Sequence, residues 1–184
     1  GPCGSSVGFA TINSLFHEFT GVNMTLYTIT DWLGLVPVFV CMIFGGIGFV
    51  QLVKRRSLFK VDYDIIFLGI YYVIVIFGYL IFEMIPINYR PILIDGYLEA
   101  SYPSSTTMLV MCVMPTAAIQ LNARIKNNLL RRIAITSIVA FTAFMVMGRL
   151  VSGVHWVTDI VGGALLSVGL VETYCCFAFE EGSR

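Results

Sequence analysis

The sequence predicts an all-α membrane protein, a polytopic bundle of transmembrane helices, on two observations. The first is composition: 58% of the 184 residues are hydrophobic and 12% are charged, whereas a soluble domain carries about 25% charged residues. The second is the division of the chain into five apolar runs, each of a length that can cross a bilayer as a helix. The formal net charge is zero, so no nucleic-acid partner is indicated.

The first 30 residues are more mixed than the rest of the chain. We expect residues 1–30 to form an interfacial segment on the outer face and residues 31–184 to form a single transmembrane domain of catalytic type. Thr30 or Asp31 is the expected N-cap of the first span. Apolar side chains recur at helical spacing with polar ones between them, which is typical of a helix lying in the interface; they are Phe9, Ile12, Leu15, Phe16 and Phe19.

The connections between the predicted spans differ in charge. The spans cover residues 32–53, 63–85, 104–122, 133–148 and 156–178. Eight of the eleven basic residues lie in two connections, 54–60 and 124–132, and the positive-inside rule places these in the cytoplasm. Because the spans alternate in direction, the remaining segments share the outer side: residues 1–30, 86–103 and 149–155.

Neither a cofactor nor a metal site is predicted. The two histidines, His17 and His155, are far apart in sequence, and no carboxylate cluster suits Mg²⁺. The five cysteines have irregular spacing and form no disulfide framework. We interpret His17 as an ordinary polar residue of the interfacial segment; the lesser alternative is that it covers a site on the same side.

The connection between the last two spans carries the residues that suggest chemistry. Ionisable groups at a membrane edge are costly and usually functional, and Arg149, His155 and Asp159 are three of them. On a helix, His155 and Asp159 would share one face, so the carboxylate could hold one imidazole nitrogen and leave the other free as a nucleophile. Arg149 offers a planar fork for phosphate oxygens. The alternative is a pair of helix ends with interfacial charges.

A second outer segment adds further candidates. The proline after Arg90 sets a helix boundary there. Ser104 and Ser105 open the third span and offer hydroxyls and free backbone N–H groups that could cradle an anion. Alone, these serines would indicate only an ordinary N-cap. The convergence of Arg90, both serines and Arg149 on one membrane face favours a phosphate site.

Together these segments resemble the type 2 phosphatidic acid phosphatase (PAP2) superfamily of membrane lipid phosphatases. The family pattern is Lys, six residues, Arg-Pro; then Pro-Ser-Gly-His or a near variant; then Ser-Arg, five residues, His, three residues, Asp. The resemblance covers residues 83–159 and includes the third spacing without a gap. The matching residues in chain order are Arg90-Pro91, Pro103-Ser104-Ser105, Arg149, His155 and Asp159.

The resemblance implies both fold and roles. The family core has six helices, so the absent one would precede residue 1, either trimmed from the chain or lost in its lineage. His155 would be the nucleophile that forms a phosphohistidine, with Asp159 orienting it and no metal required. The phosphate would be bound by Arg90, Arg149 and the backbone of Ser104 and Ser105.

Three positions depart from the family pattern. Glu83 stands where the first motif has lysine, which replaces a cation with an anion. Thr106 stands where the second motif has the histidine that protonates the leaving oxygen. Threonine cannot donate that proton near neutral pH, and general acid catalysis is worth about 10²–10⁴-fold. Gly148 replaces the serine of the third motif, which we expect to matter less.

We therefore expect an integral enzyme of a bacterial cell membrane whose active site faces outward. It would hydrolyse a phosphomonoester or pyrophosphate of an isoprenoid or glycerolipid, with membrane lipids as partners and a homo-oligomer left open. The alternative is an impaired family member that binds or transports lipid phosphates, an interpretation that Glu83 and Thr106 favour. A purely structural subunit would not explain why the candidate residues converge.

Overall fold

Seven α-helices make up most of residues 1–180, the part of the chain that the computed structural model describes. Residues 181–184, at the end of the expected transmembrane domain, lie outside the described residues. The helices are α1 (Ala10–Thr20), α2 (Met24–Leu33), α3 (Leu35–Arg55), α4 (Tyr63–Met84), α5 (Ser105–Arg124), α6 (Asn128–Val151) and α7 (Val157–Glu180), with 3-10 turns η1 (Pro2–Gly4) and η2 (Leu58–Lys60).

Five helical stretches within the described residues are long and apolar enough to cross a membrane. They carry many large apolar side chains on their outer surfaces, as expected where lipid is the solvent. Each contains most of one predicted span, so the prediction of a polytopic helix bundle with five spans is confirmed. The stretches are Met24–Arg55, Tyr63–Met84, Ser105–Arg124, Asn128–Val151 and Val157–Ala178.

The start of the first span differs from the prediction. Asn23 is the N-cap, since its side chain accepts a hydrogen bond from the backbone N–H of Leu26 at 2.9 Å. The prediction of a cap at Thr30 or Asp31 was wrong because Thr30 lies inside α2 and donates to the Leu26 carbonyl at 2.9 Å. Helix α2 thus runs across residue 30; the division of the chain there into two segments stays a prediction.

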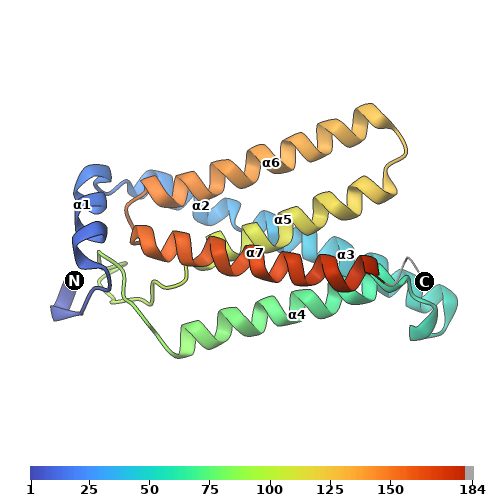
Figure 1. Ribbon diagram of the computed structural model, residues 1–184, viewed down its shortest axis with the longest axis horizontal. Coiled ribbons are helices and arrows are strands. Elements are labelled where there is room, and N and C mark those ends of the chain that lie inside the picture. Colours follow the sequence, from blue (N-terminus) through green and yellow to red (C-terminus); the bar gives the residue numbers. More distant parts are fainter. Residues whose placement is uncertain (181–184) are drawn as a thin grey trace.

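Helix α5 is the centre of the bundle and packs against α3, α4, α6 and α7 (Figure 1). Because neighbours surround it, α5 buries polar side chains, and Thr107, Thr116 and Gln120 among them are hydrogen-bonded. The hydroxyls of Thr116 and Tyr72 are 3.2 Å apart, and Gln120 donates to the Tyr174 hydroxyl at 2.8 Å. These bonds fix α4 and α7 in register with α5, the helix that carries Ser105 and Thr106.

The N-terminal helix α1 lies across the end of the bundle where the 85–104 connection and the turn between α6 and α7 also meet (Figure 1). Asn13 of α1 is fully buried and donates to the Thr158 hydroxyl at 2.8 Å. Nearby, the chain passes so close to Gly153 (φ +68°) that a Cβ there would lie 1.8 Å from the Gly21 carbonyl oxygen. The candidate residues are therefore brought to one end of the molecule.

Candidate active site

A buried hydroxyl links the candidate dyad. Ser101 Oγ lies 3.0 Å from His155 Nδ1 and donates a hydrogen bond to Asp159 Oδ2. The three side chains are at most 4% exposed. Helical spacing predicts a direct contact between His155 and Asp159; the structure places Ser101 between them, because the 85–104 connection enters the space beside the start of α7.

Asp159 is held from three directions. Besides Ser101, the backbone N–H of Trp156 donates to Oδ2 at 3.0 Å, and Asn88 Nδ2 donates to Oδ1 at 3.3 Å. The indole of Trp156 donates to the Tyr89 carbonyl at 2.7 Å, which ties the start of α7 to the 85–104 connection. Asp159 is therefore a fixed acceptor that aligns two segments.

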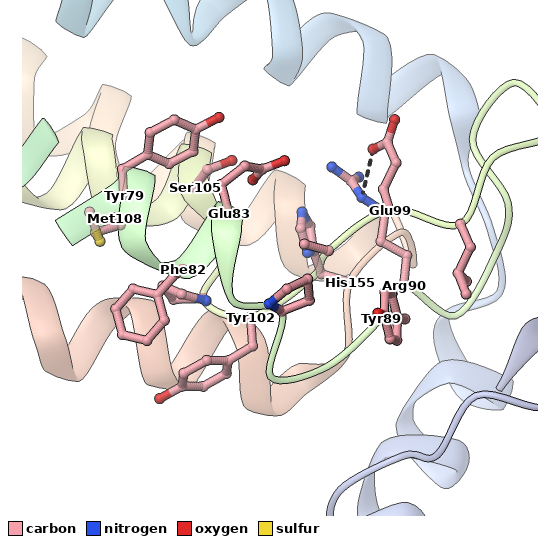
Figure 2. A pocket seen from close by; sticks show the side chains of 14 residues that line it. Tyr79, Phe82, Glu83, Tyr89, Arg90, Glu99, Tyr102, Ser105, Met108 and His155 are labelled. Carbon is pink, nitrogen blue, oxygen red and sulfur yellow. Dashed lines mark ion pairs between the residues drawn. The ribbon is translucent and has the colours of Figure 1, made fainter. Parts of the chain in front are cut away.

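A cavity of about 450 Å³ lies beside His155. Its lining includes His155, Arg90, Ser105 and the exposed Glu83. In the view of Figure 2, Glu83 and Ser105 lie on one side of His155, and the ion pair of Arg90 with Glu99 lies on the other. Within the part of the chain that is described, the buried Nε2 of His155 has no hydrogen-bond partner. The imidazole thus presents a free nitrogen next to a cationic group.

Both candidate arginines are buried around one aromatic ring. The Tyr27 ring centroid lies 4.7 Å from Arg149 Cζ and 5.7 Å from Arg90 Cζ. Each guanidinium also has an acidic neighbour, Glu99 at 3.1 Å from Arg90 and Asp31 at 3.5 Å from Arg149. Among the described residues, Nη1 of Arg90 and Nε of Arg149 have no hydrogen-bond partner. Buried N–H donors without a partner are suited to binding an anion.

The environment of His155 keeps its imidazole neutral. Burial lowers the pKa of His155 well below its usual range, and the charges of Arg90 and Arg149 lower it further. A neutral imidazole keeps the lone pair that nucleophilic attack requires.

Two of the predicted site residues do not line the cavity. They are Arg149 and Ser104, which are absent from the described residues around it. The backbone N–H of Ser104 donates to the Asp159 carbonyl at 3.1 Å, so it is not available to a phosphate, contrary to the expectation. The Ser104 hydroxyl accepts from Thr107 at 3.1 Å. Of the two serines, only Ser105 faces the cavity.

The three positions that depart from the family pattern, Glu83, Thr106 and Gly148, have different surroundings. Glu83 lines the His155 cavity, whereas Thr106 lines an adjoining pocket of about 420 Å³ together with Asp31 and Gly34. A Cβ at Gly148 would lie 2.7 Å from Thr30 Cγ2, so the close packing of α2 on α6 explains the glycine. In residues 1–180, no group of three His, Cys, Asp or Glu side chains is arranged to hold a metal ion.

A family model, described as the PAP2 superfamily, matches residues 38–181. The chain belongs to the PAP2 superfamily. PAP2 membership supports a membrane lipid phosphatase activity in general, and together with the five spans it makes the chain an integral membrane protein.

A solved PAP2 structure has a similar fold. It is the "first transmembrane PAP2 type phosphatidylglycerolphosphate phosphatase from Bacillus subtilis", with a TM-score of 0.64 and 18% sequence identity. The match covers 94% of this chain and 87% of the other. No curated protein sequence has a significant match to the chain. At this identity the likeness concerns the PAP2 fold.

Sequence reasoning missed Ser101, Tyr27 and Asn88. Ser101 precedes the second PAP2 motif by two residues, and a hydroxyl beside that motif was the available signal. Tyr27 and Asp31 are one helical turn apart, so recognising α2 as a helix would have grouped them on one face. Asn88 lies in the connection after α4 and has no local pattern that marks it.

Proposed function

We propose that the protein is a metal-independent lipid-phosphate phosphatase that works through a phosphohistidine on His155. The observation that carries this proposal is the free, buried Nε2 of His155, a residue that lines the same cavity as Arg90. A neutral nucleophile next to a guanidinium suits a phosphate group, because the cation neutralises charge on the phosphoryl oxygens. The membership in a family of lipid phosphatases agrees with this chemistry.

The reaction has two steps. In the first, Nε2 attacks phosphorus, a P–N bond forms, the P–O bond to the alcohol breaks, and the leaving oxygen takes a proton from water. In the second, a water oxygen attacks phosphorus and the P–N bond breaks, which releases inorganic phosphate and restores neutral His155. The proton that this water loses neutralises the hydroxide left from the first step. Arg90, Arg149 and the helix start at Ser105 supply positive potential throughout, so we expect no metal requirement.

We place the substrate in the outer leaflet of the membrane. The 85–104 connection, which supplies most residues of the cavity lining, lies at the end of the bundle opposite the two basic connections (Figure 1). The positive-inside rule assigns the basic connections to the cytoplasm. Apolar residues such as Phe82 and Met108 line the cavity together with the charged ones. This mixture suits an isoprenoid or glycerolipid phosphomonoester or pyrophosphate, whose head is anionic and whose tail is apolar.

The test is phosphate release from a panel of lipid phosphates by the purified protein with EDTA present. We expect turnover by the parent, loss of turnover in His155→Ala, and a smaller defect in Asp159→Asn, which changes hydrogen bonding but retains the imidazole. Activity that disappears in EDTA and returns with Mg²⁺ would overturn metal independence. Equal turnover by the parent and His155→Ala would exclude the phosphohistidine.

A second function, binding or transport of lipid phosphates without turnover, is favoured by specific contacts. Glu99 occupies one side of Arg90 at 3.1 Å, and Glu83 adds another carboxylate to the cavity. Both would reduce the positive potential that stabilises charge in the transition state, so turnover would suffer more than binding. Saturable binding of a lipid phosphate, with no phosphate release in single-turnover assays, would support this function over the enzyme.

A further inference from the structure

Ser101 is placed to act through His155. It lies in the 85–104 connection and is 1% exposed. Its backbone N–H donates to the Asn88 carbonyl at 2.8 Å, so its position is set by the same segment that holds Asp159. Its hydroxyl contacts both members of the candidate dyad.

The direction of each hydrogen bond follows from the donors available. An ionised carboxylate only accepts hydrogen bonds, so the single hydroxyl hydrogen of Ser101 points to Asp159 Oδ2. The Ser101 oxygen then faces His155 Nδ1, 3.0 Å away, with its lone pairs. For this contact to be a hydrogen bond, Nδ1 must carry the imidazole hydrogen. In the neutral ring that leaves the lone pair on Nε2, the nitrogen without a hydrogen-bond partner among the described residues, in a side chain that lines the cavity.

We propose that Ser101 is a positioning residue that holds His155 in the Nδ1–H tautomer. Its hydroxyl donates to the Asp159 carboxylate and accepts from the imidazole, so it connects the two by a pair of hydrogen bonds. The inference rests on the proposed function, because it assumes that His155 attacks through Nε2. Without the hydroxyl, the ring loses its contact with Asp159 and can take the opposite tautomer, with hydrogen on Nε2 and no lone pair for phosphorus. A three-membered relay of Asp159, Ser101 and His155 thus replaces a direct pair.

The tautomer can be measured directly because the chain has two histidines. In protein labelled with ¹⁵N-histidine and reconstituted in lipid nanodiscs, the signals of His155 are assigned by comparison with a His17→Gln variant. A non-protonated ring nitrogen and a protonated one have well-separated ¹⁵N shifts. We expect the non-protonated signal of the parent at neutral pH to come from Nε2. A parent that shows the Nε2–H tautomer would overturn the proposal without any change to Ser101.

Two variants and a control separate positioning from packing. Ser101→Ala removes the hydroxyl, and Ser101→Thr keeps it. Ser167→Ala is the matched control, because Ser167 is also fully buried and its hydroxyl donates to the Gly163 and Met108 carbonyls, at 2.7 and 3.3 Å, and to neither member of the dyad. Thermal unfolding of all three reports any general loss of packing.

In Ser101→Ala we expect kcat to fall on the order of 10–100-fold, as for other groups that orient a functional histidine. KM should change little, because Ser101 does not bind phosphate, and the ¹⁵N spectrum should shift to a mixture of tautomers. Ser101→Thr should restore most of kcat, and Ser167→Ala should leave kcat and the spectrum unchanged. An unchanged kcat and spectrum in Ser101→Ala would refute the relay.

The two proposals fail in different ways. If no lipid phosphate is hydrolysed by the parent, the proposed function fails, while the ¹⁵N spectra of the parent and Ser101→Ala still decide whether Ser101 sets the tautomer. If the parent is active and the tautomer is independent of Ser101, the relay fails and the phosphatase stands.

Discussion

At the scale of single residues, the charge state of His155 determines when the site can react. Burial and the two arginines lower the pKa of its imidazole, so the folded protein keeps the ring neutral at pH values where a free histidine, with a pKa of about 6.5, takes up a proton. Asp159 and Ser101 then direct the neutral ring, and the arginines provide the charge complementary to phosphate.

This shift predicts how rate and stability depend on pH. Because kcat/KM reports the free enzyme, kcat/KM should persist below about pH 6.5, since the nucleophile remains unprotonated. Below that pH the unfolded chain binds a proton at His155 that the folded chain does not, so stability should be lost as pH falls through this region. Rate and thermal unfolding of the parent and His155→Gln, compared from pH 8 downward, measure both effects. A rate that is lost with a midpoint near the value of free histidine would contradict the prediction.

Thr106 predicts a defect that depends on the leaving group. A departing alkoxide needs a proton that threonine cannot supply, whereas p-nitrophenolate leaves without one. Thr106→His should therefore raise turnover of a lipid phosphate on the order of 10²-fold and affect an aryl phosphate much less. The pocket of about 420 Å³ beside Thr106 offers space for an imidazole and shares Ser105 and Met108 with the lining of the His155 cavity.

The measurement for Thr106 is single-turnover hydrolysis of both substrates by the parent and Thr106→His. Glu83→Gln serves as a companion variant, because it removes a carboxylate from the cavity without adding an acid of imidazole type. Equal gains on both substrates in Thr106→His would mean that another group protonates the leaving oxygen.

At the scale of elements, α1 braces the segment that carries the nucleophile. Asn13 donates to the Thr158 hydroxyl, and its Oδ1 accepts from the Thr158 backbone N–H at 3.3 Å. The ring of His17 contacts that of Trp156, with centroids 5.5 Å apart. The apolar side chains of α1, such as Phe19, are exposed, as expected of a helix in the interface.

Removing the Asn13 amide should weaken this brace. Asn13→Ala leaves the part-buried hydroxyl and N–H of Thr158 without this partner, which should cost about 1 kcal/mol, and we expect lower thermal stability together with lower turnover. Ser14→Ala is the control, because Ser14 is on the exposed side of the same helix. If Asn13→Ala loses stability but keeps full turnover, α1 is a structural support that does not influence the site.

At the scale of the whole molecule, the two basic connections, 54–60 and 124–132, lie at the end of the bundle opposite the 85–104 connection of the candidate site (Figure 1). At the basic end, a hydrogen bond from Arg55 to Asp62 at 2.6 Å lowers the pKa of the Asp62 carboxyl, and Arg124 donates to Asp64 at 2.6 Å. Each of these partly exposed pairs contributes little to the free energy of unfolding. Together they join the ends of α3, α4 and α5 that lie away from the cavity.

The orientation can be tested with single cysteines in intact cells. Tyr97→Cys should react with a membrane-impermeant maleimide added outside, because Tyr97 is 75% exposed in the connection beside the site. Lys60→Cys, exposed at the basic end, should react only after the cells are opened. The exposed native Cys3 and Cys176 are first replaced by serine. The reverse labelling pattern would place the site in the cytoplasm.

The sequence by itself determined the class of fold, the five spans, the basic connections and the spacing of Arg149, His155 and Asp159. These features depend on local composition and order along the chain, since a bilayer selects long apolar helices. Only the tertiary structure decided that Ser101 bridges His155 and Asp159, that Tyr27 contacts two arginines, and that Glu99 pairs with Arg90. These contacts depend on how the connecting segments pack against the helices, and hydropathy does not encode that packing.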